Sequence, residues 1–334
     1  MPSESNKKLT ILYILEILKE YSDEDHPLTQ VEIIEKLNNI YSMPCERKTI
    51  SRNIEYLIDF GYEIIKKGNS GCYLLSRDFE SSELTFLIDA IFNSKSITAK
   101  HARELTQKLT KNASVYDKNR FKYILKADNV YRTPNKQLFY TIDTLNKAIT
   151  EGKKVSFNYN SFTTSKEFLP RNNGKTYVIS PYYMANNNGK YYLICNYDHY
   201  DTLAHYKIDQ ITNIKIMPRS PIRPIETLSD YEPNFDIAKY INDKIYMFSG
   251  ISVDAILEVG PKTINDVIDW FGDNCHIREV HQDKIIVSVT ANEQALMYWC
   301  LQYGEGVIIK SPVSLRDKFK QTLYKIVENY NKDI

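Results

Sequence analysis

The sequence predicts an α+β protein of several domains: an N-terminal winged helix-turn-helix, a small β-barrel and a C-terminal ferredoxin-like α/β domain. Three observations support this prediction. Helical apolar spacing followed by a short β pattern fills residues 1–77, strand-like alternation begins at Lys154, and residues 250–334 follow the order β-α-β-β-α-β. With 334 residues, the chain is also longer than one hydrophobic core usually serves.

Three helices are predicted near the N-terminus. Apolar residues repeat at helical spacing over residues 7–21, and Thr29 with Glu32 forms a capping-box pattern that begins a second helix at Thr29. A third apolar stripe follows Pro44. It leaves basic and hydroxyl side chains on the opposite side, so this third helix has an apolar back and a basic front.

A β-hairpin is predicted next, over residues 62–75, with its turn at residues 68–71 and two lysines leading into that turn. Three helices and a hairpin are typical of a winged helix that reads DNA, because the third helix enters the major groove while hairpin lysines reach phosphates. The alternative is an ordinary solvated helix face. The predicted DNA-contacting residues are Thr29, Gln30, Arg47, Lys48, Thr49, Ser51, Arg52, Lys66 and Lys67.

The third helix also resembles a known recognition helix. Residues 47–54, with the sequence Arg-Lys-Thr-Ile-Ser-Arg-Asn-Ile, are followed by Leu57 and Gly61 and resemble that helix of DeoR-type winged-helix repressors. The family usually has Asp where this chain has Asn53, a difference that leaves the basic residues in place. The resemblance implies binding to a double-stranded DNA operator.

Several short β patterns with Asn/Gly turns between them predict the barrel over residues 154–216. Two stretches, Tyr-Tyr-Leu at residues 191–193 and Tyr-Lys-Ile-Asp-Gln-Ile at residues 206–211, resemble the signature motifs of the WYL domain of bacterial regulators. Tyrosine stands at the first position, where that family has Trp. The resemblance assigns residues 141–217 to a WYL domain and implies an Sm-like or SH3-like barrel.

The WYL resemblance implies a pocket for a nucleotide or nucleic-acid fragment. Two arginines of the second motif are replaced by Lys207 and Gln210, and lysine offers a point charge where arginine offers a planar fork. Tyrosine rings can stack on bases while Lys207 and His205 hold phosphate. The alternative is that alternating tyrosines pack within the barrel. The predicted effector-binding residues are Tyr159, Ser180, Tyr182, Tyr192, His205 and Lys207.

The remaining segments are distinguished by charge and by proline. Residues 78–140 are predicted to be linker helices and carry 11 basic and 7 acidic side chains, although the whole chain has a net charge of only +1. A proline cluster marks residues 218–249 as an interdomain linker. Residues 250–334 resemble the C-terminal extension that accompanies WYL domains, in which Trp299 and Cys300 are expected in the core.

Other functional classes lack their motifs. The sequence contains no dinucleotide-binding, phosphate-loop, zinc-protease or hydrolase-elbow motif, so we predict no enzyme activity, no cofactor and no metal site. Five scattered cysteines fit neither a disulfide framework nor a zinc ribbon, and redox sensing through Cys72 is a minor alternative. The longest apolar run, at residues 295–301, is far shorter than the roughly 20 residues that span a membrane, so a cytoplasmic protein is expected.

Together these features predict a ligand-responsive transcriptional regulator, a repressor by analogy, that binds operator DNA as a homodimer and responds to a nucleotide or oligonucleotide effector. Two-fold symmetry doubles what a single recognition helix can read. The alternative is an RNA- or single-stranded-DNA-binding accessory protein that modulates a nucleic-acid-processing or defence system. A nucleotide-processing enzyme is a third class, which the missing motifs disfavour.

Overall fold

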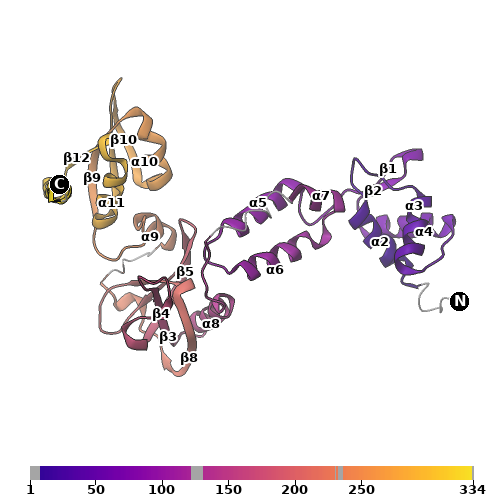
Figure 1. Ribbon diagram of the computed structural model, residues 1–334, viewed down its shortest axis with the longest axis horizontal. Helices are drawn as coiled ribbons and strands as arrows, with labels where there is room; N and C mark the ends of the chain where they lie inside the picture. Colours follow the sequence, from indigo (N-terminus) through magenta and orange to yellow (C-terminus); the bar gives the residue numbers. More distant parts are fainter. Residues whose placement is uncertain (1–7, 122–130, 230, 232–235, 333–334) are drawn as a thin grey trace. The chain divides into compact units, whose positions relative to one another are not determined.

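The computed structural model divides into two compact units, Met1–Arg132 and Thr133–Ile334 (Figure 1). The described residues form a mixed α/β structure with three separate β-sheets. These two units are coarser than the five segments expected from the sequence, and the boundaries of those segments stay predictions. The structure describes residues 8–121, 131–229, 231 and 236–332.

The N-terminal part of the first unit has the predicted order of three helices and a hairpin. Each helix turns its apolar stripe inward, and the shared core includes Ile14, Leu18, Ile33, Leu37, Ile50 and Ile54. The two strands pair antiparallel. The elements are α2 (Thr10–Tyr21), α3 (Gln30–Tyr41), α4 (Arg47–Phe60), β1 (Ile64–Lys66) and β2 (Cys72–Leu74).

Two local devices fix this arrangement. The Thr29 hydroxyl accepts the Glu32 N–H at 3.3 Å, and the Glu32 carboxylate accepts the Thr29 N–H at 2.8 Å, which confirms the predicted capping box. The hairpin is attached to the chain before α3 by a β-bridge between Leu28 and Cys72. Gly71 has a φ of +100°, and a Cβ there would lie 2.1 Å from the Leu28 carbonyl oxygen, so the close approach requires glycine.

Three further helices follow in the first unit: α5 (Ser81–Asn93), α6 (Ala99–Leu109) and α7 (Val115–Arg120). The helices α5 and α6 lie side by side (Figure 1). Their small core contains Leu84, Ile88, Phe92, Ala113 and Phe121. The apolar stripe of α5 is visible in the sequence, whereas α6 and α7 bury fewer apolar residues and are not individually predictable from it.

The second unit begins with α8 (Leu138–Thr150), which packs against a six-stranded antiparallel sheet. Its buried residues are Leu138, Thr141, Leu145 and Ala148, whereas Ile142 and Ile149, which the sequence places on the same apolar stripe as Leu138 and Leu145, are half-buried. The strands pair in the order β4-β3-β5-β6-β7, and β8 pairs with β3. They are β3 (Lys153–Phe162), β4 (Phe168–Pro170), β5 (Thr176–Asn187), β6 (Lys190–Asn196), β7 (Ala204–Lys207) and β8 (Ile211–Pro221).

This sheet does not close into the barrel that the sequence predicts. Within the described residues, β7 pairs with β6 and β8 pairs with β3, but no hydrogen-bonded ladder joins β7 to β8. The physical reason lies at residues 208–210. There a 3-10 turn interrupts what the sequence presents as one alternating strand, so β7 ends after Lys207 before it can meet another edge.

Residues 218–249 are more than a linker. β8 extends to Pro221, a 3-10 turn follows at Ile225–Thr227, and α9 spans Ile237–Asp243, whereas Pro233 lies outside the described residues. We call residues 222–229 and 236–249 the covering segment, because their apolar side chains pack on one face of the sheet. This core joins Ile222, Ile225, Leu228, Ile237, Tyr240, Ile241 and Met247 to Tyr182, Ala185, Tyr192, Ile194 and Leu203.

The C-terminal sheet has the predicted β-α-β-β-α-β order. Its four strands are antiparallel and lie in the order β10-β11-β9-β12. Trp299 and Cys300 are fully buried, which confirms their expected place in the core. The elements are β9 (Ser252–Val259), α10 (Ile264–Phe271), β10 (Cys275–Val280), β11 (Ile285–Asn292), α11 (Glu293–Tyr303) and β12 (Val307–Ser311).

The last helix, α12, spans Val313–Lys332 and has Leu315 buried near its start. Leu323, Val327 and Tyr330 are exposed along its remaining turns. In the part of the chain that the structure describes, no helix is both long enough and apolar enough to cross a membrane.

Candidate nucleic-acid interface and effector site

The helix α4 presents the basic front that the sequence predicts. Arg47, Lys48 and Arg52 are exposed, while Ile50 and Ile54 on the other side are buried. Gly61, in the left-handed region at a φ of +113°, ends the helix. The cations therefore occupy the first turns of a helix whose apolar side anchors it to the core.

A groove of about 580 Å³ lies between the start of α3, the exposed side of α4 and the hairpin. Across it, the Gln30 Nε2 donates a hydrogen bond of 2.7 Å to the Ser51 Oγ, which ties the two helices together. Of the residues predicted to contact DNA, those that line the groove are Thr29, Gln30, Arg47, Ser51 and Lys66. Those outside its lining are Lys48, Thr49, Arg52 and Lys67.

The two hairpin lysines already have partners within the protein. Lys66 forms an ion pair with Glu55 of α4, so a carboxylate stands in the groove beside the cation. Lys67 donates a 2.8 Å hydrogen bond to the Glu24 carbonyl oxygen, and its Nζ lies 5.1 Å from the centre of the Tyr73 ring. Either lysine must give up such contacts to reach a phosphate.

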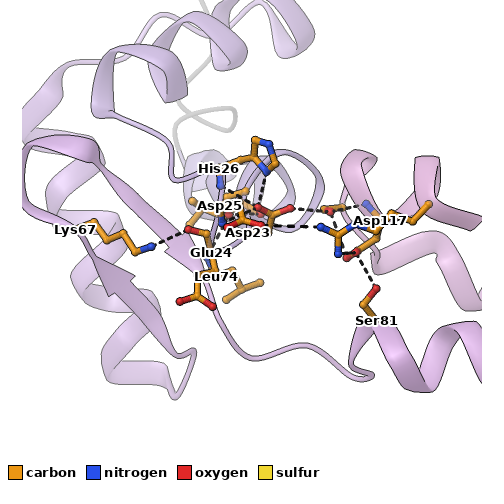
Figure 2. Close-up of polar contacts among 12 residues, drawn as sticks. Asp23, Glu24, Asp25, His26, Lys67, Leu74, Ser81 and Asp117 are labelled. Atoms are coloured by element: carbon orange, nitrogen blue, oxygen red, sulfur yellow. Dashed lines mark hydrogen bonds and ion pairs between the residues drawn. The ribbon is translucent and has the colours of Figure 1, made fainter.

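A polar network joins the loop before α3 to α7 (Figure 2). The Asp23 carboxylate lies 2.6 Å from the His26 Nδ1, and the Ser114 hydroxyl donates to its other oxygen at 3.4 Å. The His26 ring stacks on Tyr116 with centroids 3.6 Å apart. We call the contact between residues 23–26 and α7 the loop–α7 joint. Sequence reasoning missed it, because its residues are far apart in the chain.

Arg77 also contributes hydrogen bonds to this region. Its guanidinium donates to the Lys19 carbonyl oxygen at 2.8 Å and to the Ser22 carbonyl oxygen at 2.5 Å. Burial lowers the pKa of Arg77, and the nearby Asp117 and Asp23 carboxylates oppose that shift. Figure 2 shows Asp117 beside this network, where it also accepts a 3.0 Å hydrogen bond from Ser81.

The predicted effector residues Ser180 and Tyr182 are bonded to the covering segment. The Arg223 N–H donates to the Ser180 hydroxyl at 3.0 Å, and the Tyr182 hydroxyl donates to the Arg223 carbonyl oxygen at 2.7 Å. Both side chains are buried. Burial is the main cause that raises the pKa of Tyr182 to about 12. The backbone N–H and carbonyl group of Arg223, in the covering segment, thus form hydrogen bonds with both hydroxyls.

His205 is covered in the same way. Its Nε2 lies 2.9 Å from the Tyr240 hydroxyl of α9, and its Nδ1 lies 3.4 Å from the Ser249 hydroxyl. Burial, followed by repulsion from Lys244, lowers the pKa of His205 to about 4. In this arrangement the ring carries no charge at neutral pH and both of its nitrogens face hydroxyl partners, so it is not the cation expected from the sequence.

Tyr192 and Lys207 stand opposite each other on β6 and β7, as the motif resemblance implies. The Tyr159 hydroxyl accepts the Lys207 N–H at 3.1 Å, so the backbone of β7 ties Tyr159 to this pair. Burial lowers the pKa of Lys207, and Lys190 adds repulsion. Burial raises the pKa of the neighbouring Asp209, which Lys207 partly offsets.

The structure also gathers aromatic rings that sequence reasoning left out. Tyr206 forms edge contacts with Tyr159, at 4.9 Å between centroids, and with Tyr177, at 5.7 Å. It stands opposite Leu193, one position away from the Tyr192–Lys207 pair, and so points to the other face of the sheet. The predicted effector set is therefore divided, because Tyr159 belongs to this second face and Tyr192 to the covered one.

Two cations border the second face. The Arg171 guanidinium lies 5.9 Å from the Tyr159 ring centre. The Lys175 Nζ lies 5.5 Å from the ring centres of both Tyr177 and Tyr197. Both cations are exposed. The signal in the sequence was the tyrosine excess near Arg171 and Lys175, but only the strand register shows which tyrosines share a face.

The contacts and burial of the remaining His, Cys, Asp and Glu side chains decide whether they could bind a metal or react. Among the described residues, no group of three or more His, Cys, Asp or Glu side chains could hold a metal ion. Asp201 pairs with Arg223 at 2.8 Å. Cys72, the first residue of β2, is buried, and burial raises the pKa of its thiol to about 11, which disfavours the reactive thiolate.

The chain is similar to the solved structure of proteasome accessory factor B/C (PafBC) of Arthrobacter aurescens, at 14% identity and a TM-score of 0.27, over 93% of this chain and 47% of that one. It thus spans about half the length of that protein. It is also similar to a structure described as a CRISPR Cas-related protein, at 14% identity and a TM-score of 0.38, over 100% of this chain and 88% of that one.

Comparison with curated proteins gives no match. The family model of the WYL domain matches residues 140–216, which include most of α8 and most of the six-stranded sheet. This match agrees with the motifs on β6 and β7. Residues 140–216 are therefore a WYL domain.

Proposed function

We propose that this protein is a ligand-responsive transcriptional regulator, acting as a repressor, in which residues 8–76 form a winged helix that binds operator DNA. The observation that carries the proposal is the exposed basic front of α4, presented by a three-helix core beside a hairpin. A helix with this polarity suits the major groove, where arginine can read guanine with two hydrogen bonds.

The groove beside α4 supports a division of roles. Arg47 lines the groove, and Arg52 is exposed five residues further along α4, outside the groove lining, and both are proposed to contact bases. Gln30 and Ser51 hold α3 and α4 in register through their hydrogen bond. Lys66 contacts phosphate after exchanging its partner Glu55, which makes the hairpin contribution weak and dependent on salt.

One winged helix reads too few base pairs to specify a genomic site. We therefore propose a homodimer on pseudo-palindromic DNA, with half-sites about one or two helical turns apart. The exposed apolar positions of α12, Leu323, Val327 and Tyr330, are available for pairing two copies.

The WYL domain is proposed to take the effector, a nucleotide or short oligonucleotide. On the second face, the half-buried Tyr177 and Tyr206 offer their rings beside the buried Tyr159, while the exposed Arg171 and Lys175 offer charge for phosphate. Binding on the other face, at Tyr192, His205 and Lys207, requires displacement of the covering segment. We propose that the effector displaces the covering segment when it binds. We also propose that the protein binds the effector without catalytic turnover.

The same tyrosines and cations favour a second candidate function, an RNA- or single-stranded-DNA-binding accessory protein, because base stacking beside cations is how many such proteins bind. Selection of bound fragments from genomic DNA with the full chain tests the two. A shared palindromic duplex motif supports the regulator. Enrichment of single strands without a duplex motif supports the accessory protein and contradicts the operator-binding proposal.

A further inference from the structure

A cavity of about 300 Å³ lies among the linker helices, and its lining shares no residue with either site described above. Ligand pockets in proteins usually begin at about this size, and they are mostly apolar with a few polar groups that fix orientation. The cavity is lined by Phe92 of α5, by Arg103, Thr106 and Gln107 of α6, by Thr110, by Lys118 of α7 and by Phe121.

The walls combine two aromatic rings with two cations. Phe92 and Phe121 are buried members of the small core between α5 and α7, so their rings form an apolar surface inside the bundle. Arg103 is exposed and Lys118 is half-buried, which puts positive charge at the rim. An apolar interior with a cationic rim matches a molecule that has an apolar body and one anionic end.

Thr106 supplies an independent observation. It is only 4% exposed and it lines the cavity, and within the described residues its hydroxyl Oγ1, which is out of contact with solvent, has no hydrogen-bond partner. A buried hydroxyl without a partner costs stability, and in native proteins such groups are uncommon. Its neighbour Thr110 does not fill the gap, because the Thr110 hydroxyl donates to the Thr106 carbonyl oxygen at 2.9 Å.

We propose that this cavity binds a small aromatic anion, with its ring against Phe92 and Phe121, its carboxylate or phosphate at Arg103 and Lys118, and a polar atom bonded to the Thr106 hydroxyl. The site is separate from the WYL domain and from the basic front of α4. Aromatic rings pack favourably on one another, and cations at the rim favour the anion over the neutral acid.

The position of Lys118 gives such a ligand a consequence. Lys118 lies on α7, and the same helix carries Asp117 and Arg120. Arg120 lies 4.0 Å from Asp25 in the loop before α3, and Ser114, which caps α7, donates to Asp23 (Figure 2). A ligand that binds Lys118 therefore also restrains α7, which forms one side of the loop–α7 joint.

Calorimetry on the full chain with benzoate and phenyl phosphate tests the site, with benzyl alcohol as the uncharged probe. We expect one of the two anions to bind and to raise the unfolding midpoint, and benzyl alcohol to bind at least about tenfold more weakly. Lys118→Gln should lower affinity about tenfold, while Lys111→Gln, an exposed lysine that does not line the cavity, should leave it unchanged.

Thr106→Val supplies the decisive variant. Because the hydroxyl has no partner in the free protein, its removal should leave the unfolding midpoint of the free chain unchanged or higher, while affinity for the anion falls about fivefold. No binding of either anion, or equal binding by wild type and both cavity variants, would overturn the proposal. A destabilised Thr106→Val chain that binds as wild type would overturn it too, because the hydroxyl would then serve the fold. None of these readouts involves DNA, so they are independent of the proposed operator binding.

Discussion

The Nε2 of His205 lies 2.9 Å from the hydroxyl of Tyr240, and this contact joins β7 of the WYL domain to α9 of the covering segment. The pair also accounts for the uncharged state of the histidine, because the covering segment removes it from water. A residue expected to face an effector is thus held by the protein's own chain.

The first prediction concerns pH. The pKa of His205 falls from an ordinary value of 6.5 to about 4 on folding, so between those values the unfolded chain binds more protons than the folded one. Stability from this group is full above about pH 6.5 and is lost as the pH falls toward 4, by up to about 3 kcal/mol. His205→Gln should flatten this part of the profile in urea unfolding at pH 7 and 4.5. Equal pH dependence in both proteins would contradict the covered arrangement.

The second prediction concerns the acid in the DNA groove. Glu55→Gln removes the carboxylate that pairs with Lys66, so it should strengthen binding to every duplex and steepen the dependence on salt. Glu35→Gln on α3, also exposed but outside the groove lining, is the matched control and should have a smaller effect. Titrations of a labelled duplex at several salt concentrations measure both. If Glu55→Gln weakened binding, Lys66 would not be a phosphate contact.

The third prediction concerns two glycines of the hairpin. Gly71→Ala should destabilise the first unit by about 2 kcal/mol or more, because the added methyl group meets the Leu28 carbonyl oxygen and the positive φ is strained. Gly68 has a φ of +57° and open space where a Cβ would lie, so we expect Gly68→Ala to lower the free energy of unfolding by only about 1 kcal/mol. Denaturant unfolding compares them. Equal costs would show that the close approach at Leu28 does not hold the hairpin.

The fourth prediction concerns the loop–α7 joint. Ser114 is fully buried, its hydroxyl oxygen accepts the Asp117 N–H that caps α7, and its single proton is shared between the Asp23 and Asp117 carboxylates. Ser114→Ala should cost about 1–2 kcal/mol and should speed amide hydrogen exchange in residues 115–120. Protection of α4 should be retained, because its core does not involve Ser114. Loss of protection across α4 as well would mean that the two parts unfold as one unit.

Much of the fold could be predicted from periodicity. The helices of residues 8–60, the capping box at Thr29 and the order of elements after residue 250 all follow from local patterns that pack without conflict. The 3-10 turn at residues 208–210 could not, because alternation continues through it and only the strand register shows where β7 ends. The open sheet follows from that turn.

For the candidate sites, the sequence predicted the types of residue present but not the contacts that those residues make. Residue types near Tyr192 and Lys207 indicate a binding chemistry. The sequence does not show that the covering segment packs against this face of the sheet, because that segment carries no periodic signal. Likewise, nothing local shows that Lys66 pairs with Glu55 or that Asp23 meets Ser114. Long-range polar contacts decide which predicted residues are free to meet a ligand, and single-sequence patterns do not encode them.

Binding of a selected genomic duplex by the wild type and by the Arg47→Ala, Arg52→Ala double variant tests the central claim most directly. We expect the wild type to prefer that duplex to a scrambled one and to its separated strand, and the double variant to lose about 1–3 kcal/mol of the preference for each base contact removed. Lys175→Ala should leave duplex binding unchanged. If the separated strand bound as tightly as the duplex, and Lys175→Ala weakened it while the double variant did not, the basic front of α4 would not be the nucleic-acid interface.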